Sequence, residues 1–175
     1  EAYNRYWNDQ KAARVVCFRA PMTCHNNIRL LCMRDTEEMR DWYRYLTTVT
    51  IFNAWDTAAH ALNGLDKDSD SCLLTDNPIL VENTREDPAI LCIQRLAEKR
   101  RVTQADLIQA NINSFGDEIG AITNRITSMF EVQARFAPGS EAYQTLDYRI
   151  KCGQLFQQNA IDKAKGILAK PMPKE

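Results

Sequence analysis

The sequence lacks any long hydrophobic run: no apolar stretch in its 175 residues approaches the roughly 18 residues that a membrane-spanning helix requires. It also lacks an excess of charge, because 22 lysines and arginines stand against 23 aspartates and glutamates. The resulting net charge of −1 excludes binding to nucleic acid by bulk electrostatic attraction alone. With 45% hydrophobic residues and no visible repeat, a wholly disordered or collagen-like chain is also excluded.

Paired cysteines of the C-x-x-C type are absent too, although the chain has six cysteines. Several of them, such as Cys17 and Cys92, lie within apolar runs, where cysteine behaves as a small buried hydrophobe. A zinc site built from Cys17, Cys24, His25 and Cys32 has the spacing of no common zinc finger. With no basic-then-apolar leader, the cysteine pattern predicts a protein of the reducing cytoplasm.

The first part of the chain, residues 1–95, has a mixed pattern of strands and short helices. Stretches rich in β-branched and apolar residues predict strands at 12–19, 28–33, 47–52, 71–75 and 89–94. Helices are predicted at 36–46, where Thr36 is suited to the N-cap, and at 56–62, with a helical turn after Asn77-Pro78. We expect the three tryptophans, Trp7, Trp42 and Trp55, to lie in the core.

The second part, residues 96–175, has the spacing of amphipathic helices. Thr103 and Asp106 form a capping-box pattern that predicts a helix to about residue 114. Isoleucines at helical spacing predict a second helix that ends before Pro138-Gly139, and Ser140 is suited to cap a last long helix. The pattern therefore predicts an α+β protein with a helical C-terminal part.

Three aspartates, Asp66, Asp68 and Asp70, alternate in a short loop after a glycine. Carboxylates in this arrangement can converge on one hard cation, whose charge offsets their mutual repulsion. A solvated acidic turn is the simpler interpretation. A calcium loop of the EF-hand type is another, but counting from Asp66 it has Ser71 in place of the required glycine and Asn77 in place of the final glutamate.

Basic and imidazole groups stand upstream, directly after the first long strand. Arg19 is followed by a proline turn and by His25, and 41 residues separate His25 from Asp66. An arginine held at such a turn can contact a phosphate or a ribose. The alternative is an arginine at a strand end beside a packed histidine.

Together, the segment Arg19-Ala-Pro-Met-Thr-Cys-His25 and the loop Asp66-Lys-Asp-Ser-Asp70 resemble the catalytic region of the largest (beta-prime) subunit of cellular RNA polymerases. The similarity includes phage-type single-chain relatives, which share double-psi β-barrels. In this family a strand leads into an Arg-x-Pro-x-x-His-like segment, and the magnesium-binding Asp-x-Asp-Gly-Asp loop follows at a similar distance. The resemblance covers residues 12–76 by recognisable motifs and 77–175 by general similarity.

The resemblance implies a partial double-psi β-barrel-like part followed by a helical extension. It implies nucleotide addition to an RNA 3′ end by two Mg²⁺ ions, for which Mn²⁺ can substitute. Asp66, Asp68 and Asp70 would hold the metal and serve as the catalytic carboxylates. Arg19 would contact the incoming ribose, and His25 would brace the turn.

The chain departs from the family pattern at three positions of the loop. Ser69 stands where the family has glycine, so a positive φ there would disfavour it by roughly 1 kcal/mol. Lys67 replaces an aromatic residue. The family's ribose-reading asparagine corresponds in position to Gly64, which leaves Asn63, one residue earlier, as the candidate substrate contact.

A second barrel, which supplies lysines for the triphosphate in this family, does not fit in 175 residues. We therefore expect the chain to be part of a larger polymerase, incomplete alone, with nucleoside triphosphates, RNA, a template and a second barrel as partners. A phage origin would place it in the bacterial host cytoplasm. The alternative from another class is a non-catalytic, α-rich interaction or structural module with an acidic surface loop.

Overall fold

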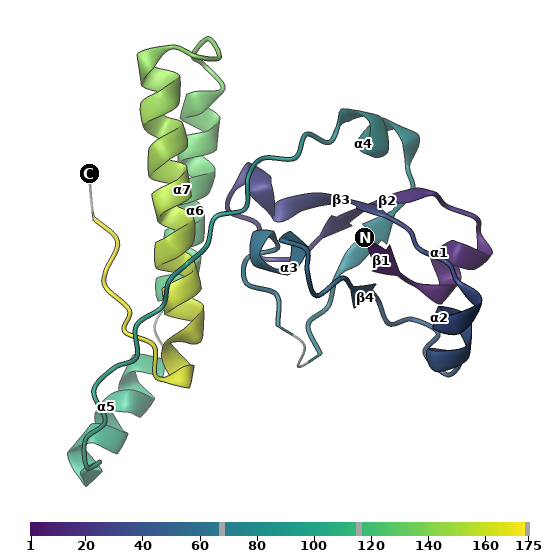
Figure 1. The fold of residues 1–175 in the computed structure, drawn as a ribbon. Coiled ribbons are helices and arrows are strands. Elements are labelled where there is room, and N and C mark those ends of the chain that lie inside the picture. The colour runs from purple at the N-terminus through teal and green to yellow at the C-terminus, as the bar shows by residue number, and fades with distance from the viewer. Residues whose placement is uncertain (67–68, 115–116, 174–175) are drawn as a thin grey trace. The chain divides into compact units, whose positions relative to one another are not determined.

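The chain forms two compact units, Glu1–Leu91 and Cys92–Glu175, whereas the sequence pattern placed the division at 95/96. The computed structural model describes residues 1–66, 69–114 and 117–173 (Figure 1). Small antiparallel sheets and helices confirm the α+β class with a helical C-terminal part, and the described strands do not close into a barrel. Among these residues, no helix is both long enough and apolar enough to span a bilayer.

The first unit contains short strands and short helices. Its elements are β1 (Ala2–Tyr3), α1 (Arg5–Asp9), β2 (Arg14–Phe18), the 3-10 turn η1 (His25–Asn27), β3 (Ile28–Cys32), α2 (Glu37–Trp42), β4 (Ile51–Phe52), α3 (Ala58–Ala61), β5 (Leu73–Thr75) and α4 (Pro78–Asn83). The predicted strands at 12–19, 28–33 and 71–75 are confirmed with shorter bounds. Thr36 caps α2 as expected, because its hydroxyl accepts a hydrogen bond from the Met39 N–H at 3.1 Å.

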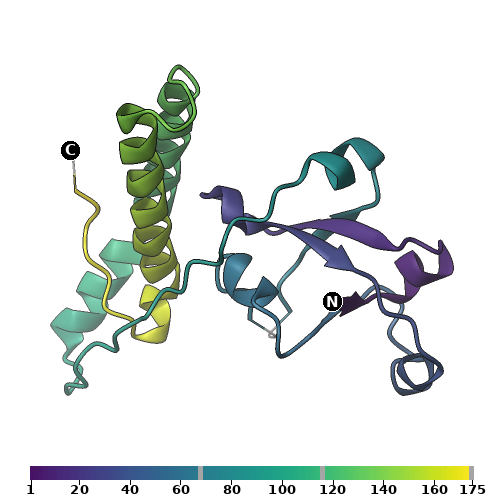
Figure 2. The ribbon, with the colours of Figure 1, turned by 45° about the horizontal axis from the view of Figure 1, so that its top comes forward.

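Strand β2 is the centre of a three-stranded antiparallel sheet of order β3-β2-β5 (Figures 1 and 2). Its residues Val15, Val16 and Cys17 are completely buried, as suits β-branched and small apolar side chains between two partners. Because β2 and β5 run antiparallel with Phe18 opposite Leu73, the chain leaving β2 lies beside the chain entering β5. This register places the residues after β2 next to the end of the acidic loop.

A second, two-stranded sheet pairs β1 with β4, with Ala2 opposite Phe52. A single core joins it to the larger sheet and to α3. The buried members of this core are Ala2, Val15, Cys17, Leu31, Ala58 and Leu62, and its partly buried members include Phe52, Leu65 and Cys72. The core therefore holds both β4 and the start of the acidic loop against the central strand.

Two of the predicted strands differ in the structure. Of residues 47–52 only Ile51–Phe52 form a strand, because β1 offers only Ala2–Tyr3 as a partner. Residues 89–94 form no strand, so that prediction is wrong. The exposed fractions of Leu91 and Ile93 are 60% and 82%, and strand propensity has little effect where no neighbouring strand supplies hydrogen bonds and packing.

The prediction of three core tryptophans is correct only for Trp7, which packs against the core of the first unit. Trp42 and Trp55 are 77% and 97% exposed. Trp42 ends α2, a helix with no buried residue, and Trp55 lies in the turn before α3. A short helix or turn at the edge of a small unit has no apolar surface under which to bury an indole ring.

The second unit consists of the helices α5 (Gln104–Ser114), α6 (Glu118–Gln133) and α7 (Glu141–Ile161), followed by the 3-10 turn η2 (Asp162–Lys165). Helices α6 and α7 form an antiparallel hairpin whose contact buries Ile122, Ile126 and Ile150. Gly153 permits this close approach, because a Cβ there would lie 2.7 Å from Cγ1 of Ile126. The predicted cap Ser140 accepts a hydrogen bond from the Tyr143 N–H at 3.3 Å.

The predicted capping box of Thr103 and Asp106 is confirmed at the start of α5. The Asp106 carboxylate accepts a hydrogen bond from the Thr103 N–H at 2.9 Å, and the Asp106 N–H donates to the Thr103 hydroxyl at 3.3 Å. Hydrogen bonds from the Thr103 hydroxyl and N–H, together with one from Arg100, lower the pKa of Asp106 to about 2. The carboxylate form is therefore the one that supports the cap.

Thr103→Ala is expected to raise the pKa of Asp106 toward its ordinary value, because it removes the largest of these stabilising hydrogen bonds. Because the folded-state pKa of Asp106 is depressed, the ionised carboxylate stabilises α5 fully above its ordinary pKa of 3.8. In the unchanged chain this stabilisation should be lost as the pH falls from there through about 2. NMR titration of the Asp106 carboxyl carbon measures its pKa in the unchanged chain and in the variant. An unchanged Asp106 pKa in the variant would contradict the assignment.

Candidate functional site

Arg19 lies directly after β2 and connects three parts of the first unit. One terminal nitrogen, Nη1, donates to the carbonyl oxygens of Leu62 and Asn63 at 3.2 and 3.0 Å. The other, Nη2, contacts Oδ1 and Oδ2 of Asp70 at 3.0 and 2.9 Å. Because the planar guanidinium has five donors, it can donate hydrogen bonds to the two carbonyl oxygens after α3 and to the Asp70 carboxylate of the acidic loop at the same time. The two sequence motifs are therefore in direct contact.

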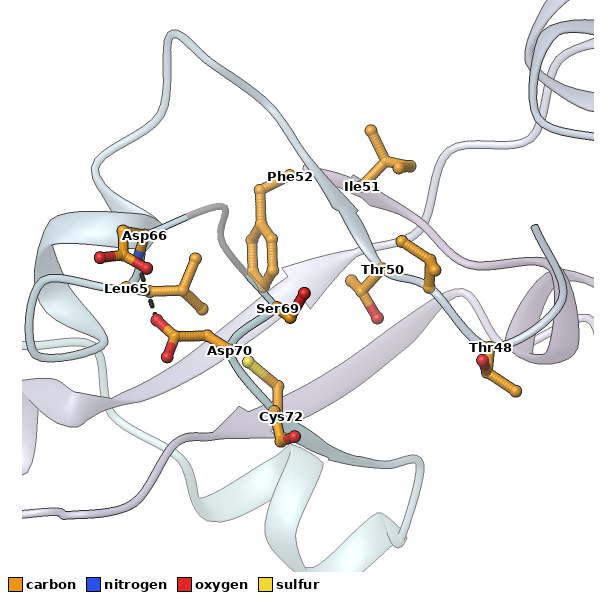
Figure 3. Close-up of a pocket in the computed structure, with 11 residues that line it drawn as sticks. Thr48, Thr50, Ile51, Phe52, Leu65, Asp66, Ser69, Asp70 and Cys72 are labelled. Carbon is orange, nitrogen blue, oxygen red and sulfur yellow. Dashed lines mark hydrogen bonds between the residues drawn. The ribbon is translucent and has the colours of Figure 1, made fainter.

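The acidic loop closes on itself through Asp70. The backbone N–H of Asp66 donates to Oδ2 of Asp70 at 2.9 Å, as the dashed line in Figure 3 shows. Both aspartates line the same cavity. Lys67 and Asp68, the other two loop residues singled out in the sequence, lie outside the described residues. The structure thus brings Arg19, Asp66 and Asp70 together.

The backbone of the loop is left-handed at Ser69, with a φ of 94°. This is the position where the resembling family has glycine, and the conformation is the one that glycine adopts without steric penalty. A non-glycine residue there stores on the order of 1 kcal/mol of strain. Such strain persists where surrounding contacts hold the backbone in place. In this loop those contacts are the hydrogen bonds of Asp70 with Arg19 and with Asp66.

The other two candidate residues, His25 and Asn63, do not line this cavity. His25 begins η1 and its side chain is exposed. Asn63 is only 3% exposed, has a φ of 58°, and donates from its side chain to the carbonyl oxygen of Pro21 at 3.2 Å. Neither residue is among those that line the cavity. Asn63 instead ties the turn after β2 to the end of α3.

The cavity has a volume of about 630 Å³ and lies between the segment 48–52 and the segments 65–66 and 69–72. Its lining residues are Thr48, Val49, Thr50, Ile51, Phe52, Leu65, Asp66, Ser69, Asp70, Ser71 and Cys72. Sequence reasoning found only the aspartates among them. Residues 47–52 were predicted as a strand. A strand pattern by itself does not indicate which of its side chains will line a cavity.

Cys72 contacts the buried Cys17 beneath this cavity. The hydrogen bond from the Cys17 thiol lowers the pKa of Cys72, and the nearby guanidinium of Arg19 lowers it further, against the opposing effects of burial and of Asp70. The same hydrogen bond, together with burial, raises the pKa of Cys17. The thiolate of this pair therefore forms on Cys72, the member that lines the cavity.

The donor chemistry of the cavity suits a hard cation. Carboxylate oxygens from Asp66 and Asp70 are the ligands that Mg²⁺ and Mn²⁺ prefer. A carboxylate has about four lone-pair sites, so Asp70 can accept hydrogen bonds from Arg19 and Asp66 and still coordinate a cation. Within the described part of the loop, which omits Asp68, no three acidic, cysteine or histidine side chains are grouped for a metal.

Comparison with known proteins adds no relative: no family model, no curated protein and no solved structure matches the chain.

Proposed function

We propose that the first unit is the catalytic, metal-binding segment of a nucleotidyltransferase of the RNA polymerase type. The observation that supports it is the contact of Arg19 with Asp70 at the edge of a cavity that also contains Asp66. Two sequence motifs of the resembling family, far apart along the chain, meet there. An acidic surface turn has no need of an arginine from the end of the central strand.

In this proposal Asp66 and Asp70, together with Asp68, hold the metal. When bound, two Mg²⁺ ions would make the RNA 3′ hydroxyl a nucleophile and neutralise the leaving pyrophosphate. Arg19 positions Asp70 and presents positive charge to the ribose or phosphates of the nucleotide. The partners would be nucleoside triphosphates, RNA, a template strand and a second barrel from the rest of a larger polymerase, in the bacterial host cytoplasm if the protein is phage-encoded.

The test is Mn²⁺ binding to the isotopically labelled chain, followed by NMR. We expect paramagnetic broadening of the amide signals of residues 65–66 and 69–72, reversed by excess Mg²⁺, because the carboxylates of this loop are the proposed ligands. Signals from residues of the same unit that do not line the cavity, such as those of α2, serve as the control. No selective broadening would favour the non-catalytic interaction module, and displacement by Ca²⁺ in preference to Mg²⁺ would favour a calcium-stabilised loop.

A further inference from the structure

Phe52 forms an apolar surface inside the cavity that contains the two aspartates. Figure 3 shows its ring extending toward Ser69, with Leu65 beside it and the carboxylates of Asp66 and Asp70 beyond. The pairing of Phe52 with Ala2 fixes the backbone from which the ring projects. The ring also packs against the core of the first unit, so its position is set before any ligand arrives.

The cavity brings acidic, aromatic and hydroxyl groups together. Leu65 lies beside the two carboxylates on one side of the Phe52 ring, Ser69 lies at the tip of the ring, and Thr50 lies on its other side (Figure 3). A volume of about 630 Å³ is in the range of sites for small molecules. A matching ligand has a flat, weakly polar ring that can stack on Phe52 and a cation-bound anionic group that can lie beside the carboxylates.

We propose that this cavity binds the nucleoside of the nucleotide substrate, with the base stacked on Phe52 and flanked by Leu65. This assignment rests on the proposed function and adds to it the position of the base. The phosphates cannot lie beside the two carboxylates without a cation, so the metal-bound phosphates lie near Asp70 and the base takes the neighbouring ring of Phe52.

The proposed subsite should accept all four bases. The described residues that line the cavity include no asparagine, glutamine or arginine side chain, which are the groups that most often read the edge of a base. Stacking on an aromatic ring is tolerant of sequence, because every base has a π-face. Selection of the base would then come from pairing with a template rather than from the residues that line the cavity.

The experiment is calorimetric titration of the whole chain, in the presence of Mn²⁺, with three probes: ATP, UTP and inorganic tripolyphosphate. Tripolyphosphate carries the anionic group without a base. Phe52→Leu keeps an apolar side chain in the core but removes the aromatic ring, so the variant retains its packing. We expect it to weaken ATP and UTP binding by about fivefold to 100-fold and to leave tripolyphosphate binding unchanged.

Two variants control for folding and for general aromatic contacts. Phe52→Tyr keeps the ring and should retain the affinity of the unchanged chain for ATP. Trp55→Leu removes an aromatic residue that is 97% exposed and outside the cavity, and it should have no effect. Loss of ATP binding in Trp55→Leu but not in Phe52→Leu would overturn the assignment.

The remaining outcomes separate this inference from the proposed function. Equal affinities of the unchanged chain for ATP and tripolyphosphate, or an unchanged ATP affinity in Phe52→Leu, would overturn the base subsite while Mn²⁺ binding at Asp66 and Asp70 still stood. Absence of Mn²⁺ binding at these aspartates would overturn the proposed function itself. Base-dependent binding that needs Phe52 would support both.

Discussion

Replacing Asp70 by alanine is expected to weaken Mn²⁺ binding by at least about 100-fold, because direct ligands matter more than the outer-shell groups whose loss costs 10- to 100-fold. The same change should lower the free energy of unfolding by about 1–3 kcal/mol, since it leaves the Arg19 guanidinium, 12% exposed, without its carboxylate. The loss of about 3–5 kcal/mol that follows from breaking a fully buried ion pair is not expected here, because Asp70 itself is 21% exposed. Electron paramagnetic resonance of Mn²⁺ and urea unfolding measure the two effects.

Two further variants separate metal binding from structure. Arg19→Ala removes the same ion pair and should cause a similar loss of stability, but it keeps both cavity carboxylates and should weaken Mn²⁺ binding less than Asp70→Ala does. Asp76→Ala changes an exposed aspartate that does not line the cavity and should affect neither quantity. If Asp70→Ala kept its Mn²⁺ affinity, the acidic loop would be a turn held by an arginine and the polymerase proposal would lose its metal site.

Asn27→Ala is expected to lower the free energy of unfolding by about 3 kcal/mol. Asn27 is completely buried, and its side-chain oxygen accepts hydrogen bonds from the backbone N–H groups of Thr23 and Cys24 at 2.9 and 3.0 Å. Its amide nitrogen donates to the carbonyl oxygen of Ala61 at 2.7 Å. Alanine would remove these three hydrogen bonds, in a domain whose total stability is of the order of 5–15 kcal/mol.

The loss of stability in Asn27→Ala should result from the burial of Asn27, and removing the hydrogen bond of an exposed asparagine should have little effect. Asn83 also donates a side-chain hydrogen bond, to the carbonyl oxygen of Ile79 at 2.8 Å, but it is exposed. Asn83→Ala should therefore change stability by no more than about 0.5 kcal/mol, because water replaces the lost partner. Similar midpoints of urea unfolding for the two variants would show that Asn27 does not hold the turn after β2 to α3.

Local patterns were reliable wherever the deciding contacts are local. Thr36, Thr103 and Ser140 each cap a helix as predicted, since an N-cap interacts only with the N–H groups two or three residues ahead. The runs that became β2 and β3 were also predictable, because each is a five-residue stretch rich in β-branched and apolar side chains. Errors arose where a neighbour was required, as at residues 89–94, which have strand-like residues but no strand beside them.

Part of the candidate site could be predicted from chemistry alone. Arg19 and the aspartates are conspicuous in the sequence, because clustered carboxylates repel one another unless a cation or an arginine offsets their charge. Phe52 and Cys72 could not be found in this way. Each is an ordinary residue for its local structure, and each lines the cavity only because β4 and the chain entering β5 are brought to the same place.

By itself the sequence determined the α+β class, the helical C-terminal part and the helix caps, because composition, periodicity and side-chain chemistry are properties of the chain. It also supplied the carboxylates that we propose as ligands of a hard cation. Only the tertiary structure decided that Arg19 pairs with Asp70 and that Phe52 stands across a cavity from Asp66. The antiparallel register of β2 and β5 and the pairing of β1 with β4 create these contacts. Such pairings join residues distant along the chain, and they depend on which buried faces pack together rather than on any local pattern.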